Sequence, residues 1–306
     1  MAKNNSITVK APAKLNIILQ ITGKRDDGYH ILNSLMQSIS LYDTITIKKL
    51  SGENKKISIS AIYSEELKRF ISEDFSVPSD PEKNISGKVA RKILDKFNIK
   101  NNIKITIKKS IPIGAGLGGG SSDGAGTAIA LNRLFNLNMS DSILRNLTKN
   151  IGADIPFNIS PGSAIVKGIG DKVKILKKDI MKNYSFIIIY PKIHSSTIKV
   201  YKNHKFRLTT KKDYVKIILN FIKKGADINL IEKYIINDLE QSAFRLYSGL
   251  KKVKHRINKL TNKKVFMSGS GSALFLLFDN DSDKEKCFKI LKMCLTECII
   301  KKCVPV

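Results

Sequence analysis

The residues from Gly114 to Ser122 carry the clearest chemical signal of this 306-residue chain, because five glycines and two serines stand there together. Before them, Ile103, Ile105 and Ile107 alternate with polar residues, which indicates a half-buried strand. After them, apolar residues recur at helical spacing. A glycine-rich turn that leads into a helix points several backbone N–H groups at one place, where the helix dipole adds about half a positive charge. The sequence therefore predicts a polyphosphate site at this turn.

Three common nucleotide motifs do not describe this turn. Gly114, Gly116 and Gly119 fit G-x-G-x-x-G formally, but the dinucleotide fold also needs a second strand that ends in an acidic residue about twenty residues later. A P-loop needs a lysine after its last glycine, whereas Ser121 follows Gly120 directly. The partner motifs of protein kinases are absent. A flexible hinge is a poor alternative interpretation. Each glycine raises the entropy cost of folding, so many glycines together are expected only where a ligand requires their backbone geometry.

Composition limits the broad class of protein. The chain has 54 Lys and Arg against 26 Asp and Glu, a net charge of +28 that by itself would favour a nucleic-acid partner. The lysines are spread along the chain, however, and the densest run, 251–264, is typical of a solvated helix face. No apolar run is long enough to span a membrane and the N-terminus has no signal-like apolar region, so we expect the protein in the cytoplasm. The cysteines match no common zinc spacing and indicate free thiols: Cys287, Cys294, Cys298 and Cys303.

Helices and strands are mixed without regular βαβ alternation, which favours an α+β fold. We place a domain boundary near residue 165, giving domains 1–165 and 166–306. Proline breaks the first apolar run at Pro12, which predicts one or two strands over Ile7–Thr22. The expected strands are 41–50, 56–62, 103–109, 163–167, 185–191 and a strand–turn–strand over 265–278; the expected helices are 85–97, a helix after the glycine turn to about 136, 140–150 with Ser140 as its N-cap, 211–224, 228–247 and 282–298.

The glycine turn resembles the phosphate loop of the GHMP kinases, the family of galactose, homoserine, mevalonate and phosphomevalonate kinases. The matching pattern is P-x-x-x-G-L-G-G-G-S-S, formed here by Pro112, Ile113, Gly114, Ala115, Gly116, Leu117, Gly118, Gly119, Gly120, Ser121 and Ser122. Segments 11–32, 151–157 and 267–275 resemble one branch of that family, which phosphorylates the 2-hydroxyl of 4-diphosphocytidyl-2-C-methyl-D-erythritol in the non-mevalonate route to isoprenoids. The resemblance implies a two-domain fold, with a ribosomal-protein-like N-terminal α+β domain and a ferredoxin-like C-terminal domain.

The resemblance assigns catalysis to Lys14 and Asp154. Without it, Lys14 would be one lysine among many, and Asp154, in a Gly-Ala-Asp-Ile-Pro turn, would be a helix-cap aspartate. As catalytic groups, the ammonium would hold the acceptor hydroxyl and lower its pKa, and the carboxylate would accept its proton. Whether Asp154 takes the proton early or mainly orients the hydroxyl stays open.

Substrate contacts are implied for five further residues. In the resembling kinases a Gly-Tyr-His element recognises cytosine, and Tyr29 and His30 supply an aromatic face and a ring nitrogen for it. Tyr190 is the candidate for the opposite stacking face, and Asn16 and Thr197 for the substrate hydroxyl and phosphates. A second glycine turn over 268–272 closes against the phosphate loop in that family, although a simple hairpin turn would explain it as well. The remaining histidines stand in no partner pattern and are interpreted as incidental: His194, His204 and His255.

ATP and a cytidyl diphosphate sugar alcohol are the expected partners, with Mg²⁺ at the phosphates but no residue assigned to hold it. No specific nucleic acid and no membrane are expected, and a homodimer stays open. Two alternatives remain: a homoserine- or mevalonate-type kinase, which would lack the Gly-Tyr-His element, and an RNA-binding protein. Aromatic residues make up 7% of the chain and no RNA-binding motif stands out, which disfavours the second alternative.

Overall fold

A computed structural model describes residues 5–70, 76–205 and 212–306. The chain forms two compact units that interleave along the sequence, the first from residues 1–13, 41–113 and 118–161, the second from 14–40, 114–117 and 162–306. They interleave because two long strands, β1 (Ser6–Lys24) and β2 (His30–Leu50), each contribute to both units. The domain boundary expected near residue 165 falls inside strand β5 (Ser163–Gly168).

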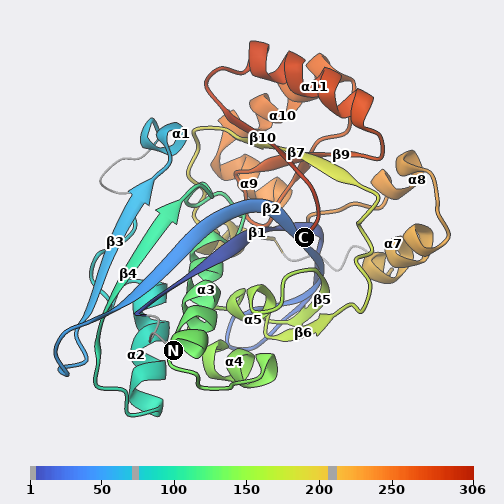
Figure 1. Ribbon diagram of the computed structural model, residues 1–306. Helices are drawn as coiled ribbons and strands as arrows, with labels where there is room; N and C mark the ends of the chain where they lie inside the picture. The colour runs from blue at the N-terminus through green and yellow to red at the C-terminus, as the bar shows by residue number, and fades with distance from the viewer. Residues whose placement is uncertain (1–4, 71–75, 206–211) are drawn as a thin grey trace. The chain divides into compact units, whose positions relative to one another are not determined.

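The first unit is a sheet covered by helices. Strand β4 (Asn102–Lys109) pairs in parallel with β3 (Ile57–Tyr63) and antiparallel with Thr44–Leu50 of β2. Helices α2 (Ile85–Lys96) and α3 (Gly119–Leu134) lie side by side along one face of these strands (Figure 1). The alternating isoleucines of β4 are fully buried in the core beneath the two helices, as their spacing predicted. The unit is completed by α1 (Glu65–Lys68), α4 (Asp141–Thr148) and α5 (Ile155–Asn158).

Strand β1 is continuous through Pro12, so of the one or two strands predicted over Ile7–Thr22, the single strand is correct. Among the strands that the structure describes, β1 pairs in this sheet with β2. A residue without an N–H group is tolerated on an edge strand, because no neighbour needs that donor.

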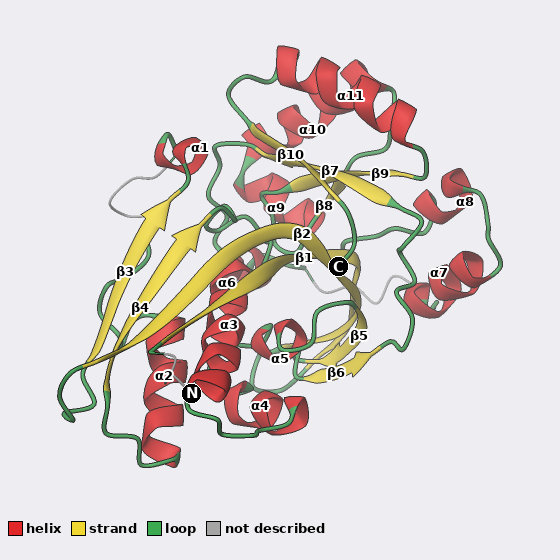
Figure 2. Cartoon of the chain, viewed as in Figure 1, coloured by secondary structure: helices red, strands yellow, loops and turns green. Residues whose placement is uncertain are grey.

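The second unit is built on an antiparallel sheet of β10 (Ile299–Cys303), β7 (Ser185–Tyr190), β9 (Leu274–Phe278) and β8 (Phe266–Met267), in that order. Every residue of β7 and β9 is buried. Their apolar side chains pack with α9 (Glu240–Leu246), α10 (Ser248–Thr261) and α11 (Asp281–Cys294), which Figure 2 draws beside the sheet. The same unit contains the β2–β5–β6 ladder, with β6 at Lys172–Ile175, and helices α6 (Thr197–Lys202), α7 (Tyr214–Lys223) and α8 (Ile228–Glu232).

The helix predicted over 228–247 is in fact two helices, α8 and α9. The side chain of Asn237, between them, donates to the carbonyls of Met267 (2.7 Å) and Gly269 (2.8 Å). Its neighbours Ile236 and Asp238 bond to Leu19 of β1. These bonds within the second unit outweigh the local helical preference.

The expectations for the fold class, the N-cap of α4 and the cysteines are confirmed. The α+β class holds, and Ser140 caps α4 by accepting from the N–H of Ile143. All four cysteines are free. In the part of the chain that the structure describes, no helix is both long and apolar enough to cross a membrane.

Candidate active site

The middle of the glycine loop is anchored in the second unit through its carbonyl oxygens. Each of the four residues from Gly114 to Leu117 accepts a hydrogen bond there. The donors are Ser195 N to Gly114 (3.3 Å), Ala273 N to Ala115 (2.9 Å), Ser268 Oγ to Gly116 (3.1 Å) and Lys14 N to Leu117 (2.9 Å). Two of these donors come from the second glycine turn and its edge, so the prediction that this turn closes against the loop is confirmed.

Glycine is required at the centre of the loop. Gly116 has φ +73, and a Cβ built on it would lie 2.3 Å from the carbonyl oxygen of Ser268. A side chain would therefore need both an unfavourable backbone conformation and a shift of the second glycine turn.

The end of the loop, in the first unit, opens helix α3. Gly118 is the N-cap, in a left-handed conformation and without a side chain to cap the helix. The first N–H to bond within the helix is that of Ser122, which donates to the Gly118 carbonyl. The N–H groups of residues 119–121 therefore have no acceptor inside the helix, and Gly120 is exposed. This is the arrangement that binds a phosphate at a helix N-terminus.

The two serines at this helix start have different environments. Ser122 is buried and its hydroxyl donates to the carbonyl of Pro12 at 2.7 Å, so this side chain joins α3 to β1. Ser121 is half-buried, and a Cβ on Gly152 would lie 3.6 Å from its hydroxyl. Ser121 therefore faces the turn that carries Asp154.

Asp154 lies in the first unit at the start of α5. It stands in the N-cap position, but its side chain makes no capping hydrogen bond, and Asn158 bonds to its backbone carbonyl instead. The carboxyl group is half-buried in a turn that packs against the first turn of α3. The ordinary interpretation of Asp154 as a capping residue therefore does not explain its side chain.

Lys14 lies in the second unit, beside the anchored part of the loop. It is 4% exposed, and its ammonium donates to Asn16 Oδ1 at 2.5 Å. Asn16 donates in turn to Ser34 Oγ (2.9 Å). A Cβ on Gly269 would lie 3.3 Å from Lys14 Nζ, which places the ammonium at the second glycine turn. Lys14 and Asp154 belong to different units, and their predicted ion pair stays a prediction.

The residues predicted to bind cytosine fall into two groups. His30 is buried, and Tyr29 is 59% exposed. The ring of His30 lies 5.4 Å from that of Tyr201 and 5.5 Å from that of His204. Tyr190 is buried in β7, where it pairs with Ile299, and its role as a stacking face stays a prediction. Tyr201, which sequence reasoning missed, is an aromatic neighbour of His30.

Burial, followed by the nearby His204 and Lys24 side chains, lowers the pKa of His30 below its usual value, which favours the neutral ring at pH 7. Its Nε2 atom is buried and makes no hydrogen bond among the described residues. A neutral imidazole with an unused nitrogen can donate to or accept from the edge of a base.

Two more residues lie at the glycine turns of the second unit. The hydroxyl of Thr197, the first residue of α6, lies 2.9 Å from that of Ser270. His194 packs on the phosphate loop, because a Cβ on Gly114 would lie 2.1 Å from its ring. His194 therefore packs on the loop and His204 packs on His30, and the interpretation of both as incidental to function stays a prediction. No spacing in the sequence signals either contact, which depends on the tertiary fold.

The described residues contain no group of three or more His, Cys, Asp or Glu side chains placed to hold a metal ion. The described residues by themselves therefore form no protein cage for Mg²⁺. This fits an ion held mainly by nucleotide phosphates and water, which is the usual mode for Mg²⁺ beside ATP.

Comparison with known proteins identifies the family. The models of the GHMP kinases N terminal domain and the GHMP kinases C terminal region match residues 84–162 and 220–293. A 4-diphosphocytidyl-2-C-methyl-D-erythritol kinase of Clostridium perfringens is 35% identical over 284 residues, which are 93% of each chain. The chain belongs to this family of GHMP kinases.

Solved structures agree with this family assignment. A crystal structure of a 4-(cytidine 5'-diphospho)-2C-methyl-D-erythritol kinase aligns with this chain at 27% sequence identity and a TM-score of 0.73. The alignment includes 97% of this chain and 99% of the kinase chain. A homoserine kinase from Cytophaga hutchinsonii, at 19% identity and a TM-score of 0.72, shares the fold. The two-domain GHMP kinase fold expected from the sequence is therefore confirmed, whereas the boundary at residue 165, which falls between the two matched regions, stays a prediction.

Proposed function

We propose that this protein transfers the γ-phosphoryl group of ATP to the 2-hydroxyl of 4-diphosphocytidyl-2-C-methyl-D-erythritol, giving the 2-phosphate and ADP. The observation that carries the proposal is the full-length match to a curated kinase of this name. The amide groups of residues 119–121, at the N-terminus of α3, supply the phosphate site that such a kinase needs.

The reaction requires one bond to form and one to break. The oxygen of the 2-hydroxyl bonds to the γ-phosphorus while the bond from that phosphorus to the β,γ-bridging oxygen breaks, and ADP leaves. The hydroxyl proton goes to the carboxylate of Asp154. The ammonium of Lys14, oriented by Asn16, holds the acceptor oxygen and offsets the charge of the phosphoryl group. Mg²⁺, when bound, would offset charge on the phosphates.

Recognition of the base rests on the His30–Tyr201–His204 cluster. Tyr201 offers the aromatic face and His30 the unused ring nitrogen. Tyr29, exposed and adjacent, can cover the base from the solvent side. Stacking on an aromatic ring contributes about 1–3 kcal/mol per base, which is enough to favour a cytidyl substrate over homoserine or mevalonate.

The proposal is tested by measuring ADP release with three acceptors: the cytidyl substrate, mevalonate and homoserine. We expect kcat/KM for the cytidyl substrate to exceed both others by at least about a hundredfold, because each alternative lacks the base and its diphosphate. A higher kcat/KM for homoserine or for mevalonate than for the cytidyl substrate would contradict the proposal. A protein that binds RNA and releases no ADP with any acceptor would contradict kinase activity altogether.

A further inference from the structure

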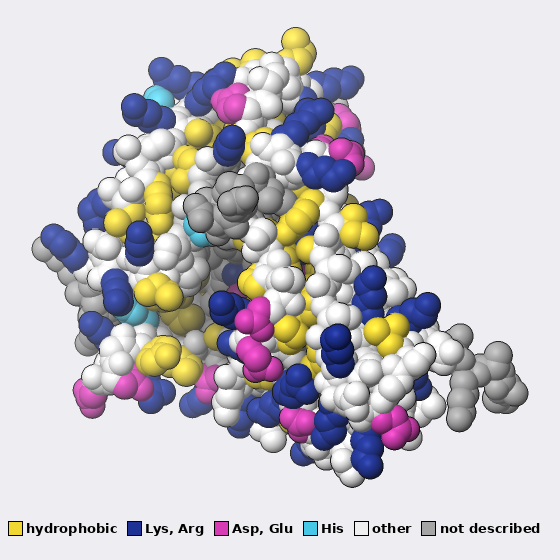
Figure 3. Space-filling model, turned by 90° about the vertical axis from the view of Figure 1, so that its left-hand side faces the viewer, with side chains coloured by type: hydrophobic (Ala, Val, Ile, Leu, Met, Phe, Trp, Pro, Cys, Tyr) yellow, Lys and Arg dark blue, Asp and Glu magenta, His cyan; other side chains and the backbone are white. Residues whose placement is uncertain are grey.

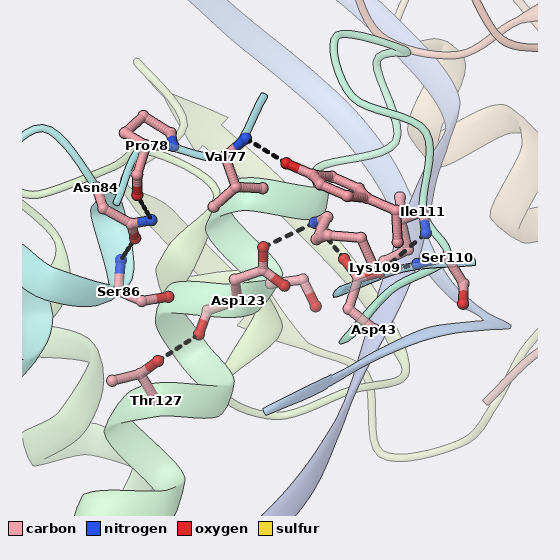
Figure 4. Close-up of polar contacts among 12 residues, drawn as sticks. Asp43, Val77, Pro78, Asn84, Ser86, Lys109, Ser110, Ile111, Asp123 and Thr127 are labelled. Carbon is pink, nitrogen blue, oxygen red and sulfur yellow. Dashed lines mark hydrogen bonds and ion pairs between the residues drawn. The ribbon is translucent and has the colours of Figure 1, made fainter. Parts of the chain in front are cut away.

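Beneath the phosphate loop, the first unit buries a cluster of three ionisable side chains that no step of the proposed reaction uses. The ammonium of Lys109 lies between the carboxyl groups of Asp43 and Asp123 (Figure 4). The side-chain exposures are 2% for Lys109, 0% for Asp43 and 6% for Asp123. Burial of charged groups is costly, so the cluster needs an explanation.

The cluster bonds to the chain on both sides of the loop. Asp43 Oδ1 accepts from the N–H groups of Ser110 (2.6 Å) and Ile111 (2.9 Å), immediately before the loop begins at Pro112. Lys109 Nζ donates to Asp123 Oδ2 at 2.7 Å, in the first turns of α3 after the loop. A single ammonium, held also by Asp43, therefore connects the strand that enters the loop with the helix that leaves it.

The loop also lies close to this ammonium. A Cβ on Gly119 would lie 3.3 Å from Lys109 Nζ and 3.1 Å from Ile111 Cγ2. Gly119 is one of the residues whose N–H group has no acceptor within the helix. The position and charge of the cluster therefore act directly on the amides that would hold the phosphates.

The charge of the cluster depends on one proton. Burial raises the pKa of Asp123 to about 8; the Lys109 ammonium lowers it and the Asp43 carboxylate raises it again. The pKa of Lys109 lies above its usual value, because the two carboxyl groups outweigh the effect of burial. At pH 7 the protonated Asp123 leaves the cluster neutral. Above about pH 8 it loses its proton, and a net negative charge arises under the loop.

No other charged group acts on Asp123 from the described elements that pack against it. Asp43 comes from β2 and Lys109 from β4. The buried residues of the neighbouring helices are uncharged: Ser86, Gly87, Val89, Ala90, Ile93 and Leu94 of α2, and Ile155, Pro156, Phe157 and Asn158 of α5.

We propose that Lys109, held between Asp43 and Asp123, is a positioning residue that fixes the phosphate loop and keeps the charge beneath it from repelling ATP. The inference rests on the proposed function only in taking the loop as an ATP site. It is tested by ATP binding alone, measured by calorimetry without an acceptor, so it can fail or hold independently of the acceptor specificity.

The first experiment compares Lys109→Met with Lys108→Met, its exposed neighbour on the same strand. We expect Lys109→Met to raise the Kd and KM for ATP about tenfold while changing the KM for the cytidyl substrate less than about twofold, because the loop holds only the nucleotide. Lys108→Met should change neither constant more than about twofold. A folded Lys109→Met protein that binds ATP as well as the natural chain, or that loses both substrates equally, would overturn the proposal.

The second experiment follows the Kd for ATP from pH 7 to pH 9 and does not depend on whether Lys109→Met folds. In the natural chain we expect the Kd to rise about fivefold over this range, as the unit charge at Asp123 develops near the phosphates. Asp123→Asn keeps the side-chain size but has no proton to lose, so its Kd should stay flat. A flat profile in the natural chain, or the same rise in Asp123→Asn, would overturn the role assigned to the cluster.

Discussion

At the scale of single residues, the clearest sign of a ligand site is an unsatisfied ring nitrogen. His30 is buried, and its Nε2 atom bonds to no described group. Such an arrangement costs stability, and folded chains keep it where a ligand or reaction uses the group. Asp154 stands at a helix start without capping it. The residue-scale predictions ask which side chains of the site serve the ligands and which serve the fold.

Asp154→Asn should reduce kcat about 10²–10⁴-fold, because an amide does not accept the proton of the acceptor hydroxyl. The Kd for ATP should change little, since the amides of α3 are intact. Single-turnover kinetics and calorimetry measure the two quantities. Asp141→Asn, an exposed aspartate of the same unit, is the control and should retain its activity. Near-normal kcat in Asp154→Asn would remove it as the base.

The two serines of α3 should separate into a functional and a structural residue. Ser121→Ala should raise the KM for ATP about fivefold, as expected for the loss of one hydrogen bond to a charged group. Ser122→Ala should instead lower the free energy of unfolding by about 1–3 kcal/mol, because it leaves the buried Pro12 carbonyl without its donor. Steady-state kinetics and urea denaturation distinguish them. Identical effects of the two substitutions would contradict this division.

Tyr201→Ala should raise the KM for the cytidyl substrate about tenfold or more and leave the KM for ATP almost unchanged, since base stacking contributes about 1–3 kcal/mol. Tyr29→Ala should have the same selectivity and a smaller effect, because its ring is largely exposed. Both constants come from ADP-release kinetics. Equal losses for the two substrates would exclude a cytosine site at His30.

At the scale of elements, two features fix the shape of the phosphate loop: its glycines, and its backbone carbonyls, which accept hydrogen bonds from the second unit. Gly116→Ala should raise the KM for ATP at least about tenfold, because its Cβ would meet the Ser268 carbonyl at 2.3 Å and displace the loop. Gly225→Ala is the matched control: its φ is +63, but a Cβ there meets nothing within 4 Å. Gly225→Ala should lower the free energy of unfolding by only about 1–2 kcal/mol and leave the KM for ATP unchanged. A normal KM in Gly116→Ala would mean that the loop tolerates the shift.

The elements that sequence predicted best are those with strong local patterns. The isoleucines of β4 and the buried β7 strand fall where their spacing indicates, and the glycine turn opens α3. The misses depend on partners distant in sequence: Asn237 interrupts a helical pattern by bonding to Met267 and Gly269, and Tyr201 meets His30 only through the fold. One signal was present but unused, since Lys109 continues the alternation of buried isoleucines in β4. Loops and strands can be predicted because their sequence patterns are local. The set of residues that meet in a site depends on the tertiary fold and cannot be predicted in this way.

At the scale of the whole molecule, the net charge of +28 is the dominant feature. Lysine and arginine side chains are scattered over the face drawn in Figure 3, among acidic and apolar ones. A dispersed positive charge attracts any polyanion weakly and defines no groove for one. We therefore expect this charge to assist the binding of small anionic substrates.

The net positive charge predicts that salt weakens the binding of ATP. Raising KCl from 50 to 500 mM should lower kcat/KM for ATP about three- to tenfold and change kcat less than about twofold, because screening weakens the attraction of the nucleotide but not the chemical step. Initial-rate kinetics in KCl and in NaCl measure the effect, and the two salts should agree. An unchanged kcat/KM would mean that the surface charge has no part in substrate binding.

The interleaving of the two units affects how the chain folds while the ribosome synthesises it. Residues 14–40 belong to a unit whose remaining sheet strands begin at residue 163, so the ribosome releases them long before their partners exist. At typical elongation rates the gap lasts about ten seconds. During that time these halves of β1 and β2 can pair with each other, but they lack strand β5 and the apolar side chains of α9, α10 and α11. A nascent chain of this protein should therefore be a client for chaperones until its C-terminal half emerges.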